Sequence, residues 1–235
     1  MPSIKNINYR FKKGCLVGIT GKVGSGKSSF LKAIVKEMPY FSGQIKMNGS
    51  IALFEQEPFI FSDTVRNNIL FGKKYDRAKY EEAVRASCLV TDFKLLAMGD
   101  QTIIGEKGAT LSGGQKARVS LARCVYSNID ILLLDDPLSA VDSKVAKEIF
   151  KRCIRPLSRE KTVILSTHQI GFLHEVDEVI ILDDGAIVEQ GTPAELNRRL
   201  KQLTESQTEE EKEEEDARKE DPSPFTSNRV SKMVS

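Results

Sequence analysis

Residues 21–29 of this chain read Gly21-Lys22-Val23-Gly24-Ser25-Gly26-Lys27-Ser28-Ser29, and this stretch decides the fold. It fits the phosphate-binding pattern G-x-x-x-x-G-K-[ST] at Gly21, Gly26, Lys27 and Ser28. An apolar run over residues 15–19 precedes it and predicts a buried strand. Apolar residues with helical spacing follow it. Strand, glycine turn and helix in this order let backbone N–H groups surround a phosphate at the positive end of a helix.

The loop therefore predicts a nucleotide site with distinct roles for its polar residues. Lys27 would reach the β- and γ-phosphates, and the Ser28 hydroxyl would bind Mg²⁺. The alternative is an ordinary glycine-rich turn before a helix, since motif matches also arise by chance. The residues expected to bind the nucleotide are Gly21, Val23, Gly24, Ser25, Gly26, Lys27, Ser28 and Ser29.

Composition and charge narrow the function classes. The chain has 235 residues and a formal net charge of +2, which indicates one domain, or a domain with a tail, large enough for a substantial core. Residues 201–235 hold 10 acidic and 6 basic side chains, whereas the first 200 residues hold 29 basic and 23 acidic. This mildly basic body suits an anionic ligand but is too weakly charged to indicate nucleic-acid binding. The four cysteines are scattered and predict reduced core residues in a cytosolic compartment.

The first half of the chain predicts short strands and then helices. Residues 4–11 alternate like a strand with one buried face. Residues 44–47 and 50–54 predict a hairpin with an Asn-Gly turn between its strands. Residues 64–98 have a helical pattern in which Asp76 is the expected N-cap.

From residue 130 the pattern alternates between buried strands and helices, which predicts an α/β fold with a mainly parallel core sheet. Residues 192–195 read Thr-Pro-Ala-Glu, a capping box that predicts the start of a helix. The further ranges expected to be strands are 131–134, 162–167, 178–182 and 187–189, and 143–154 is expected to be a helix.

The domain organisation follows from these patterns. We expect one nucleotide-binding domain over residues 1–203, with an N-terminal antiparallel β part and a helical subdomain at about 64–127. Residues 204–235 are expected to be a largely disordered tail, since an acidic run followed by a Pro/Ser-rich stretch cannot bury apolar surface.

Three further residues stand where they predict chemistry. A buried strand ends in Asp135, whose carboxylate would hold Mg²⁺ through its water shell; the alternative is an Asp that only caps the next turn. His168 follows the next predicted strand and is expected to contact the γ-phosphate, whereas His174 is expected to be an ordinary surface or core histidine. Gln56 lies just past a strand edge, where its amide would contact both Mg²⁺ and a moving neighbour.

The segment Leu111-Ser112-Gly113-Gly114-Gln115 resembles the L-S-G-G-Q signature of the ATP-binding-cassette (ABC) family, a group of P-loop NTPases. In that family the signature opens a helix whose N-terminus meets the γ-phosphate of ATP bound by a second cassette. The physical requirements are met, because small residues permit close approach and the helix dipole favours an anion. The elements that occur in family order over about residues 3–200 are the phosphate-binding loop, Gln56, the signature, Asp135, Asp142 and His168.

The resemblance can be narrowed to one subfamily. Residues 61–72 and 135–142 look like those of the first cassette of C-subfamily exporters, the multidrug-resistance-associated proteins. Residues 102–108 resemble the loop that exporters press against their transmembrane domains. The resemblance implies contacts with those domains through the Gln56 loop and through Gly105–Gly108. It also implies no nucleic-acid partner, and a place at the cytoplasmic face of a membrane that is reached only through the transmembrane domains.

Two departures from the family pattern matter. Most active cassettes have Glu after the strand-ending Asp, where it orients or deprotonates the attacking water, but this chain has the shorter Asp136. Catalytic geometry is sensitive to displacements of about 1 Å, with losses on the order of 100-fold, so Asp136 is expected to be a weak base. The family's adenine-stacking aromatic lies further upstream. Tyr9 and Phe11 are therefore expected to be packing residues, and the chain is expected to be a fragment or a truncated product.

By resemblance, the chain is a MgATP-binding, weakly hydrolysing cassette that pairs head-to-tail with a second cassette to drive export. The alternative is a regulatory nucleotide switch that gates a channel or receptor with little hydrolysis of its own. A soluble ABC ATPase is disfavoured, because the stretch from Gln56 to Ser112 leaves no room for a long coiled-coil insertion. The expected catalytic residues are Asp136, His168 and Gln56, and the expected metal ligands are Ser28, Gln56 and Asp135.

Overall fold

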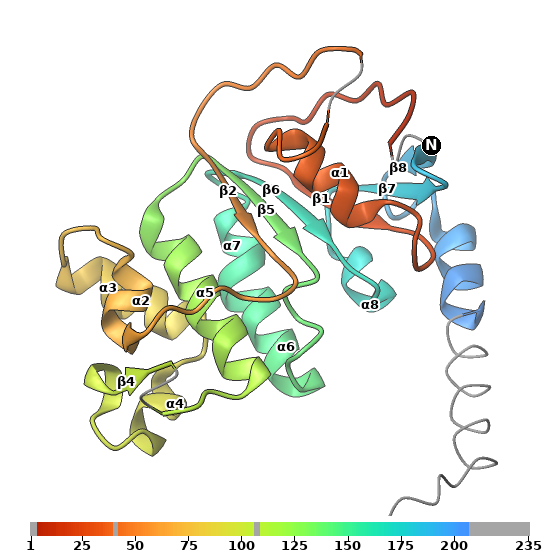
Figure 1. Cartoon of the computed structure of the whole chain (residues 1–235). Helices are drawn as coiled ribbons and strands as arrows, with labels where there is room; N and C mark the ends of the chain where they lie inside the picture. Colours follow the sequence, from red (N-terminus) through yellow and green to blue (C-terminus); the bar gives the residue numbers. More distant parts are fainter. Residues whose placement is uncertain (1–3, 40–41, 106–108, 207–235) are drawn as a thin grey trace, which may run out of the picture. The chain divides into compact units, whose positions relative to one another are not determined.

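The computed structural model describes residues 4–39, 42–105 and 109–206. The chain divides into two compact units, Met1–Asn197 and Arg198–Ser235. The first unit contains a six-stranded sheet with the order β2-β5-β6-β1-β7-β8 (Figure 1). Its strands are β1 (Leu16–Thr20), β2 (Ile51–Phe54), β5 (Ile131–Asp135), β6 (Thr162–Ser166), β7 (Glu178–Asp183) and β8 (Ala186–Gly191). The α-helices are α1 (Lys27–Ile34), α2 (Val65–Leu70), α3 (Arg77–Ala86), α4 (Val90–Leu95), α5 (Gly113–Ser127), α6 (Ser143–Ile149), α7 (Arg155–Leu157) and α8 (Ile170–Leu173).

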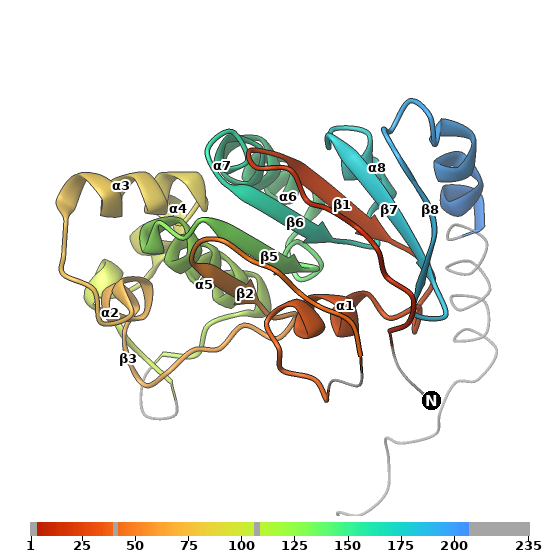
Figure 2. The ribbon, with the colours of Figure 1, turned by 90° about the horizontal axis from the view of Figure 1, so that it is seen from above.

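The sheet is covered on both faces. Strands β2, β5, β6, β1 and β7 are parallel, and β8 runs antiparallel along β7. Val17 on one face of β1 clusters with Leu31 of α1, whereas a Cβ added at Gly18 would lie 2.5 Å from Leu173 of α8. Figure 2 shows α1 and α8 on opposite sides of the sheet. The prediction of an α/β fold with a mainly parallel core sheet is therefore confirmed, since parallel strands are buried by helices on both faces.

The segment between β2 and β5 has a core of its own. β3 (Asp63–Thr64) and β4 (Ile103–Ile104) form a two-stranded antiparallel sheet, and α2 to α5 pack around it. The helical pattern predicted over residues 64–98 corresponds to three helices, α2, α3 and α4, with turns between them. Thr64 and Asp76 cap α2 and α3 by accepting hydrogen bonds from backbone amides, so the N-cap prediction for Asp76 is confirmed. The buried residues of this second core include Val65, Ile69, Tyr80, Val84, Leu111, Val119 and Tyr126.

Two N-terminal strand predictions are wrong. Residues 4–11 and 44–47 are irregular, and β2 pairs in parallel with β5 rather than in a hairpin. The alternation over residues 4–11 does reflect packing, because Ile4 and Ile7 lie against the core cluster beneath α1. A strand also needs a neighbour for its N–H and C=O groups. The described N-terminal residues have no such ladder, and antiparallel pairing occurs instead in β3–β4 and β7–β8.

The C-terminal predictions are met in part. The predicted helix over residues 143–154 is α6 followed by a π-helical turn, Phe150–Ile154. Thr192 and Glu195 exchange the hydrogen bonds of a capping box, but residues 193–196 form turns rather than a regular helix. In the second unit residues 198–206 are helical. The predicted tail from residue 207 onward lies outside the described residues.

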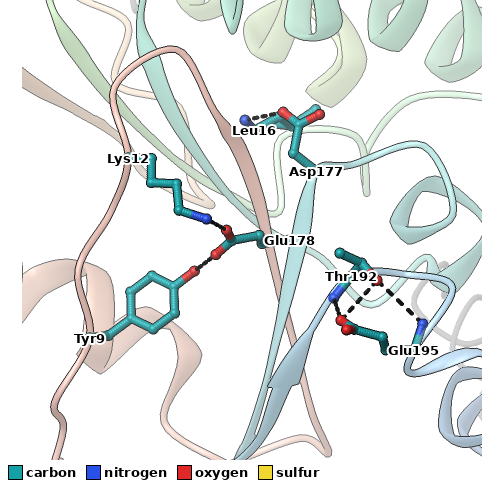
Figure 3. Close-up of polar contacts among 7 residues, drawn as sticks. All are labelled: Tyr9, Lys12, Leu16, Asp177, Glu178, Thr192 and Glu195. Atoms are coloured by element: carbon teal, nitrogen blue, oxygen red, sulfur yellow. Dashed lines mark hydrogen bonds and ion pairs between the residues drawn. The ribbon is translucent and has the colours of Figure 1, made fainter.

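Two neighbouring carboxylates join β7 to the start of the chain. The Asp177 carboxylate accepts a 2.8 Å hydrogen bond from the Leu16 N–H, and Glu178 accepts hydrogen bonds from the Tyr9 hydroxyl and the Lys12 ammonium (Figure 3). Arg155 donates to the other oxygen of Asp177, also at 2.8 Å. Burial by itself would raise the pKa of Asp177, but the hydrogen bonds from Arg155 and Leu16 hold that pKa below its ordinary value.

The Asp177 contacts give a pH-dependent prediction. We expect Asp177→Asn to lower the free energy of unfolding by about 1 kcal/mol at pH 7, after allowance for partial exposure. Because the folded-state pKa lies below the unfolded value of about 3.9, this stabilisation is present above that value and is lost as the pH falls through the folded-state pKa. Urea unfolding of both proteins should therefore show the difference narrowing below about pH 4. An equal difference at pH 3 and pH 7 would contradict the assignment.

Candidate functional site

The phosphate-binding loop is held open by its glycines. Gly21, Gly24 and Gly26 have φ values of 147°, 79° and 100°, which residues other than glycine rarely adopt. A Cβ at Gly21 would lie 2.1 Å from the Leu182 carbonyl oxygen, so β7 also leaves no room for a side chain there. Gly26 is the N-cap of α1, and the loop therefore curves into the first turn of that helix, as predicted.

Lys27 is buried inside this loop. Its ammonium donates hydrogen bonds to the carbonyl oxygens of Gly21 and Lys22, each at 2.9 Å. Burial lowers the pKa of Lys27, while Asp136 and Asp135 act in the opposite direction. The lysine is therefore a cation with little water around it, held at the loop and close to two carboxylates.

The two carboxylates come from the end of β5. Asp135 is its last residue and lies opposite Ser166 of β6 in the parallel register. Asp136 follows with a φ of 44°, and its N–H donates to the Ser166 carbonyl oxygen at 3.0 Å. Both side chains are buried. The end of β5 thus places two acidic groups at the carboxyl edge of the sheet, where only β6 separates them from β1, the strand that leads into the loop.

The Asp136 carboxylate is held by the residues that follow β6. It accepts a hydrogen bond from the Thr167 hydroxyl at 3.4 Å and another from the backbone N–H of His168. Burial raises the pKa of Asp136, and His168 opposes the shift. The sequence interpretation did not include Thr167. The sequence feature that could have indicated Thr167 is its hydroxyl side chain at the end of a buried strand, directly before His168.

His168 lies at the same edge. It is half-buried, and its pKa is lowered by burial and by the Lys27 cation, while Asp136 and Asp135 act in the opposite direction. A lowered pKa favours the neutral imidazole, which can both donate and accept a hydrogen bond. The structure thus brings together Lys27, Asp135, Asp136 and His168. His174 lies apart from this group and is exposed.

Gln56 lies beyond the end of β2. The register pairs Phe54 with Leu134, so Gln56 comes one residue after the position that lies opposite Asp135. Its side chain is exposed. Because the carboxyl ends of parallel strands meet at one edge of a sheet, Gln56 emerges at the same edge as Asp135.

The signature segment lies elsewhere in the first unit. Ser112 is the N-cap of α5, and its side chain and that of Gln115 form a complete capping box. Leu111 is buried in the second core, whereas Ser112 and Gly113 are exposed. Figure 1 shows the first turn of α5 well apart from α1. The signature therefore presents a helix N-terminus that does not contribute to the nucleotide site at this chain's own phosphate-binding loop.

The site fits a magnesium-bound nucleotide. Ser25 and Ser166 each bury a hydroxyl oxygen without a hydrogen-bond partner, a costly arrangement that an added polar group or water would relieve. The glycine loop leaves space that a Cβ would fill, and Lys27 supplies the positive charge that phosphates require. Hydroxyl, amide and carboxylate oxygens are the protein ligands that Mg²⁺ accepts beside phosphate and water. Of the candidate ligands, Ser28 and Gln56 are exposed and Asp135 is buried.

Comparison with known proteins agrees with this geometry. The family model described as ABC transporter matches residues 4–139, which is more than half of the chain. This chain belongs to the ABC transporter family. Its fold is accordingly that of a P-loop NTPase, and cassettes of this family use a nucleotide and Mg²⁺ in general.

The relatives of this cassette are C-subfamily proteins. It is 49% identical to ATP-binding cassette sub-family C member 4 of Mus musculus, over 83% of this chain and 15% of the relative. It is 52% identical to the probable multidrug resistance-associated protein lethal(2)03659 of Drosophila melanogaster, over 79% and 14%. For the multidrug resistance protein mrp-7 of Caenorhabditis elegans the identity is 48%, over 84% and 13%. The chain thus spans a small part of the length of these relatives.

Other expectations concern regions around the site. Phe11 packs edge-on against Phe30, with ring centroids 6.3 Å apart, and the Tyr9 hydroxyl is bonded to Glu178, so both behave as the predicted packing residues.

Gly105 lies against Ser62, whereas residues 106–108 of the predicted membrane-domain loop lie outside the described residues. No helix in the described part of the chain combines the length and apolarity needed to cross a membrane.

Gly21 offers a test of the loop geometry. We expect Gly21→Ala to lower the free energy of unfolding by about 1–3 kcal/mol, because Ala is strained at this φ and its Cβ would collide with the Leu182 carbonyl. Gly171→Ala is the control, since a Cβ there meets no atom within 4 Å. It should be neutral or stabilising by up to about 1 kcal/mol. Urea unfolding measures both, and equal effects would rule out the close approach of β7 to the loop.

Proposed function

We propose that this cassette binds MgATP, hydrolyses it weakly, and pairs head-to-tail with a second cassette to drive export by a C-subfamily ABC transporter. The observation that carries the proposal is the convergence of Lys27, Asp135, Asp136 and His168 beside the glycine loop. The names of the relatives, which include multidrug resistance proteins of the same subfamily, support the transport assignment.

The loop residues bind and orient the nucleotide in this proposal. The backbone amides of the loop and the Lys27 ammonium bind the phosphates, and Lys27 then exchanges its bonds to Gly21 and Lys22 for stronger charge-assisted ones. Ser28, Asp135 and Gln56 would hold the Mg²⁺ ion, directly or through water. When bound, the ion neutralises negative charge on the phosphate oxygens.

Asp136 and His168 act on the attacking water in this proposal. Asp136 is the base, and its raised pKa favours proton uptake, but its side chain is one methylene shorter than the Glu of most active cassettes. The hydrogen bonds from Thr167 and His168 hold its carboxylate close to the end of β6. Neutral His168, which lies at the same edge of the sheet, would orient the water or the γ-phosphate by a hydrogen bond. A short, tethered base accounts for slow hydrolysis at this site.

The second site of the pair uses this chain's signature. Ser112 and Gly113 are exposed, and an anion is favoured at a helix N-terminus. Because this N-terminus does not face the chain's own loop, a second cassette is needed to supply the phosphate. Asp142, the N-cap of α6, belongs by resemblance to the loop that crosses the same interface.

The transmembrane domains dock near Gln56 in this proposal. Phe59 and Phe71 are 59% and 54% exposed, and Phe61 lies between them with ring centroids 6.3 Å and 5.8 Å away. Exposed aromatic clusters of this kind mark contact surfaces for protein partners. The Gly105–Gly108 loop is the second expected contact. In this proposal the cassette lies at the cytoplasmic face of a membrane.

Lys27→Ala tests nucleotide binding. Removal of the ammonium should weaken ATP binding by about 10- to 100-fold, because charge-assisted hydrogen bonds to phosphate are lost. Lys32→Ala is the matched control on the same helix, since the Lys32 side chain is partly exposed and its ammonium lies 3.9 Å from the Glu55 carboxylate, outside hydrogen-bond distance. Isothermal titration calorimetry with MgATP measures both variants. Unchanged affinity in Lys27→Ala would refute the assignment of the loop.

Two variants test the division of labour between the sites. Ser112→Arg puts a bulky cation where a small donor must approach the γ-phosphate, and should abolish most ATPase activity and vesicle transport in the full-length protein. Asp136→Glu should raise turnover at this chain's own site, or change nothing if the partner's signature is defective. The assignment is reversed if Ser112→Arg is tolerated while Asp136→Ala abolishes transport.

A regulatory nucleotide switch is the second candidate function. The short Asp136 base favours it, because a site that binds ATP but turns it over slowly can hold the closed pair for long periods. ATP hydrolysis by the full-length protein separates the two functions. Export requires substrate-stimulated turnover, whereas a switch requires a conformational response to ATP with little turnover.

A further inference from the structure

Asp92 connects the helical subdomain to the signature. It lies in α4, is buried, and accepts three hydrogen bonds from α5. Arg118 donates two of them, at 2.9 Å from Nε and 2.8 Å from Nη2, and the Gln115 side-chain amide donates the third at 3.1 Å. A single carboxylate therefore fixes two side chains in the first two turns of the signature helix.

The Gln115 amide is engaged at both ends. Its Oε1 accepts from the backbone N–H of Ser112 at 2.9 Å, while its Nε2 donates to Asp92. The Gln115 N–H in turn donates to the Ser112 hydroxyl at 3.3 Å. Asp92 thereby selects the amide orientation that the capping box requires. The opposite orientation would point an N–H group at the Ser112 N–H.

Arg118 limits the space beside the signature. A Cβ at Gly114 would lie 3.4 Å from the Arg118 guanidinium and 2.9 Å from the Ala140 carbonyl oxygen. The guanidinium and the loop after β5 thus confine Gly114 from two sides, whereas a Cβ at Gly113 would meet only the Ala140 side chain, at 3.6 Å. The Asp92 carboxylate holds the guanidinium in that place with a bidentate pair, which fixes orientation as well as position.

We propose that Asp92 is a positioning residue for the ATPase reaction, which sets the Ser112–Gly114 turn for the γ-phosphate on a second cassette. The inference rests on the proposed head-to-tail function. Asp92 does not touch the nucleotide in it. Its carboxylate acts through Gln115 and Arg118, so that the signature is already ordered before the second cassette arrives. Preorganised donors of this kind lower the cost of reorganisation during the reaction.

The subdomain contains a matched control. Asp100 also accepts a bidentate pair from an arginine, Arg66, at 2.9 Å and 3.1 Å, and a third hydrogen bond from the Tyr80 hydroxyl at 2.9 Å. The side chains that donate to Asp100 come from α2, α3 and the neighbouring Gln101 rather than from the signature helix. Asp92→Asn and Asp100→Asn therefore break similar interactions in the same core, and only the first reaches Gln115.

The first measurement is hydrogen exchange on this chain. Asp92→Asn should speed exchange of the backbone amides of Ser112 and Gln115, which donate the two capping-box hydrogen bonds, by about tenfold. This is the factor expected for the loss of about one net hydrogen bond. Asp100→Asn should leave these amides unchanged. Asp92→Glu keeps the carboxylate and should restore part of the protection. Equal exchange at Ser112 and Gln115 in Asp92→Asn and Asp100→Asn would overturn the proposal.

The second measurement is ATPase activity of the full-length protein in vesicles. Asp92→Asn should lower kcat by about 10- to 100-fold and leave ATP binding at this chain's own loop unchanged. Asp100→Asn should leave kcat at the value of the unsubstituted protein, when its thermal stability equals that of Asp92→Asn. If Ser112→Arg abolishes activity while Asp92→Asn does not lower kcat, the positioning role fails and the proposed function stands. If neither variant affects activity, the proposed function fails as well.

Discussion

The parallel pairing of β1, β6 and β5 decides where the groups of the site stand. Ser166 of β6 lies opposite Ile19 on one side and Asp135 on the other, so the loop that follows β1 and the carboxylates that follow β5 leave the sheet at the same level. Asp136 then bonds back to the Ser166 carbonyl. A shift of one residue in either pairing would turn each of these side chains to the other face.

The buried charges at this edge explain why the site is suited to a polyanion. Lys27 is desolvated and bonded to two carbonyl oxygens, which cannot neutralise it, and its carboxylate neighbours are themselves buried. Asp135 and Asp136 raise its pKa while burial lowers it. A phosphate with Mg²⁺ would compensate both signs of charge at once. The phosphate would pair with the Lys27 ammonium, and the cation would pair with the carboxylates.

The helical subdomain has a different part in the proposed function. Its own core, together with the Asp92 contacts, orders the signature away from the loop that this chain would use to bind ATP. Each half of the active site is therefore built on rigid structure, and the two halves of one chain are held apart. In the proposed function a complete site requires two cassettes, and their association would depend on the nucleotide between them.

The sequence by itself determined those features that depend only on residues close together in the chain. Gly21, Lys27 and Ser112 were recognised from motifs because turn geometry and helix capping need particular residues at fixed spacings, and buried apolar runs marked β1, β5 and β6. The tertiary structure decided which strands pair. Residues 4–11 and 44–47 alternate in sequence yet are irregular, because a strand exists only where another strand offers hydrogen-bond partners. Thr167 as a partner of Asp136, and Asp92 as a partner of Gln115, likewise became visible only in the fold, because each contact joins residues more than twenty positions apart in the chain.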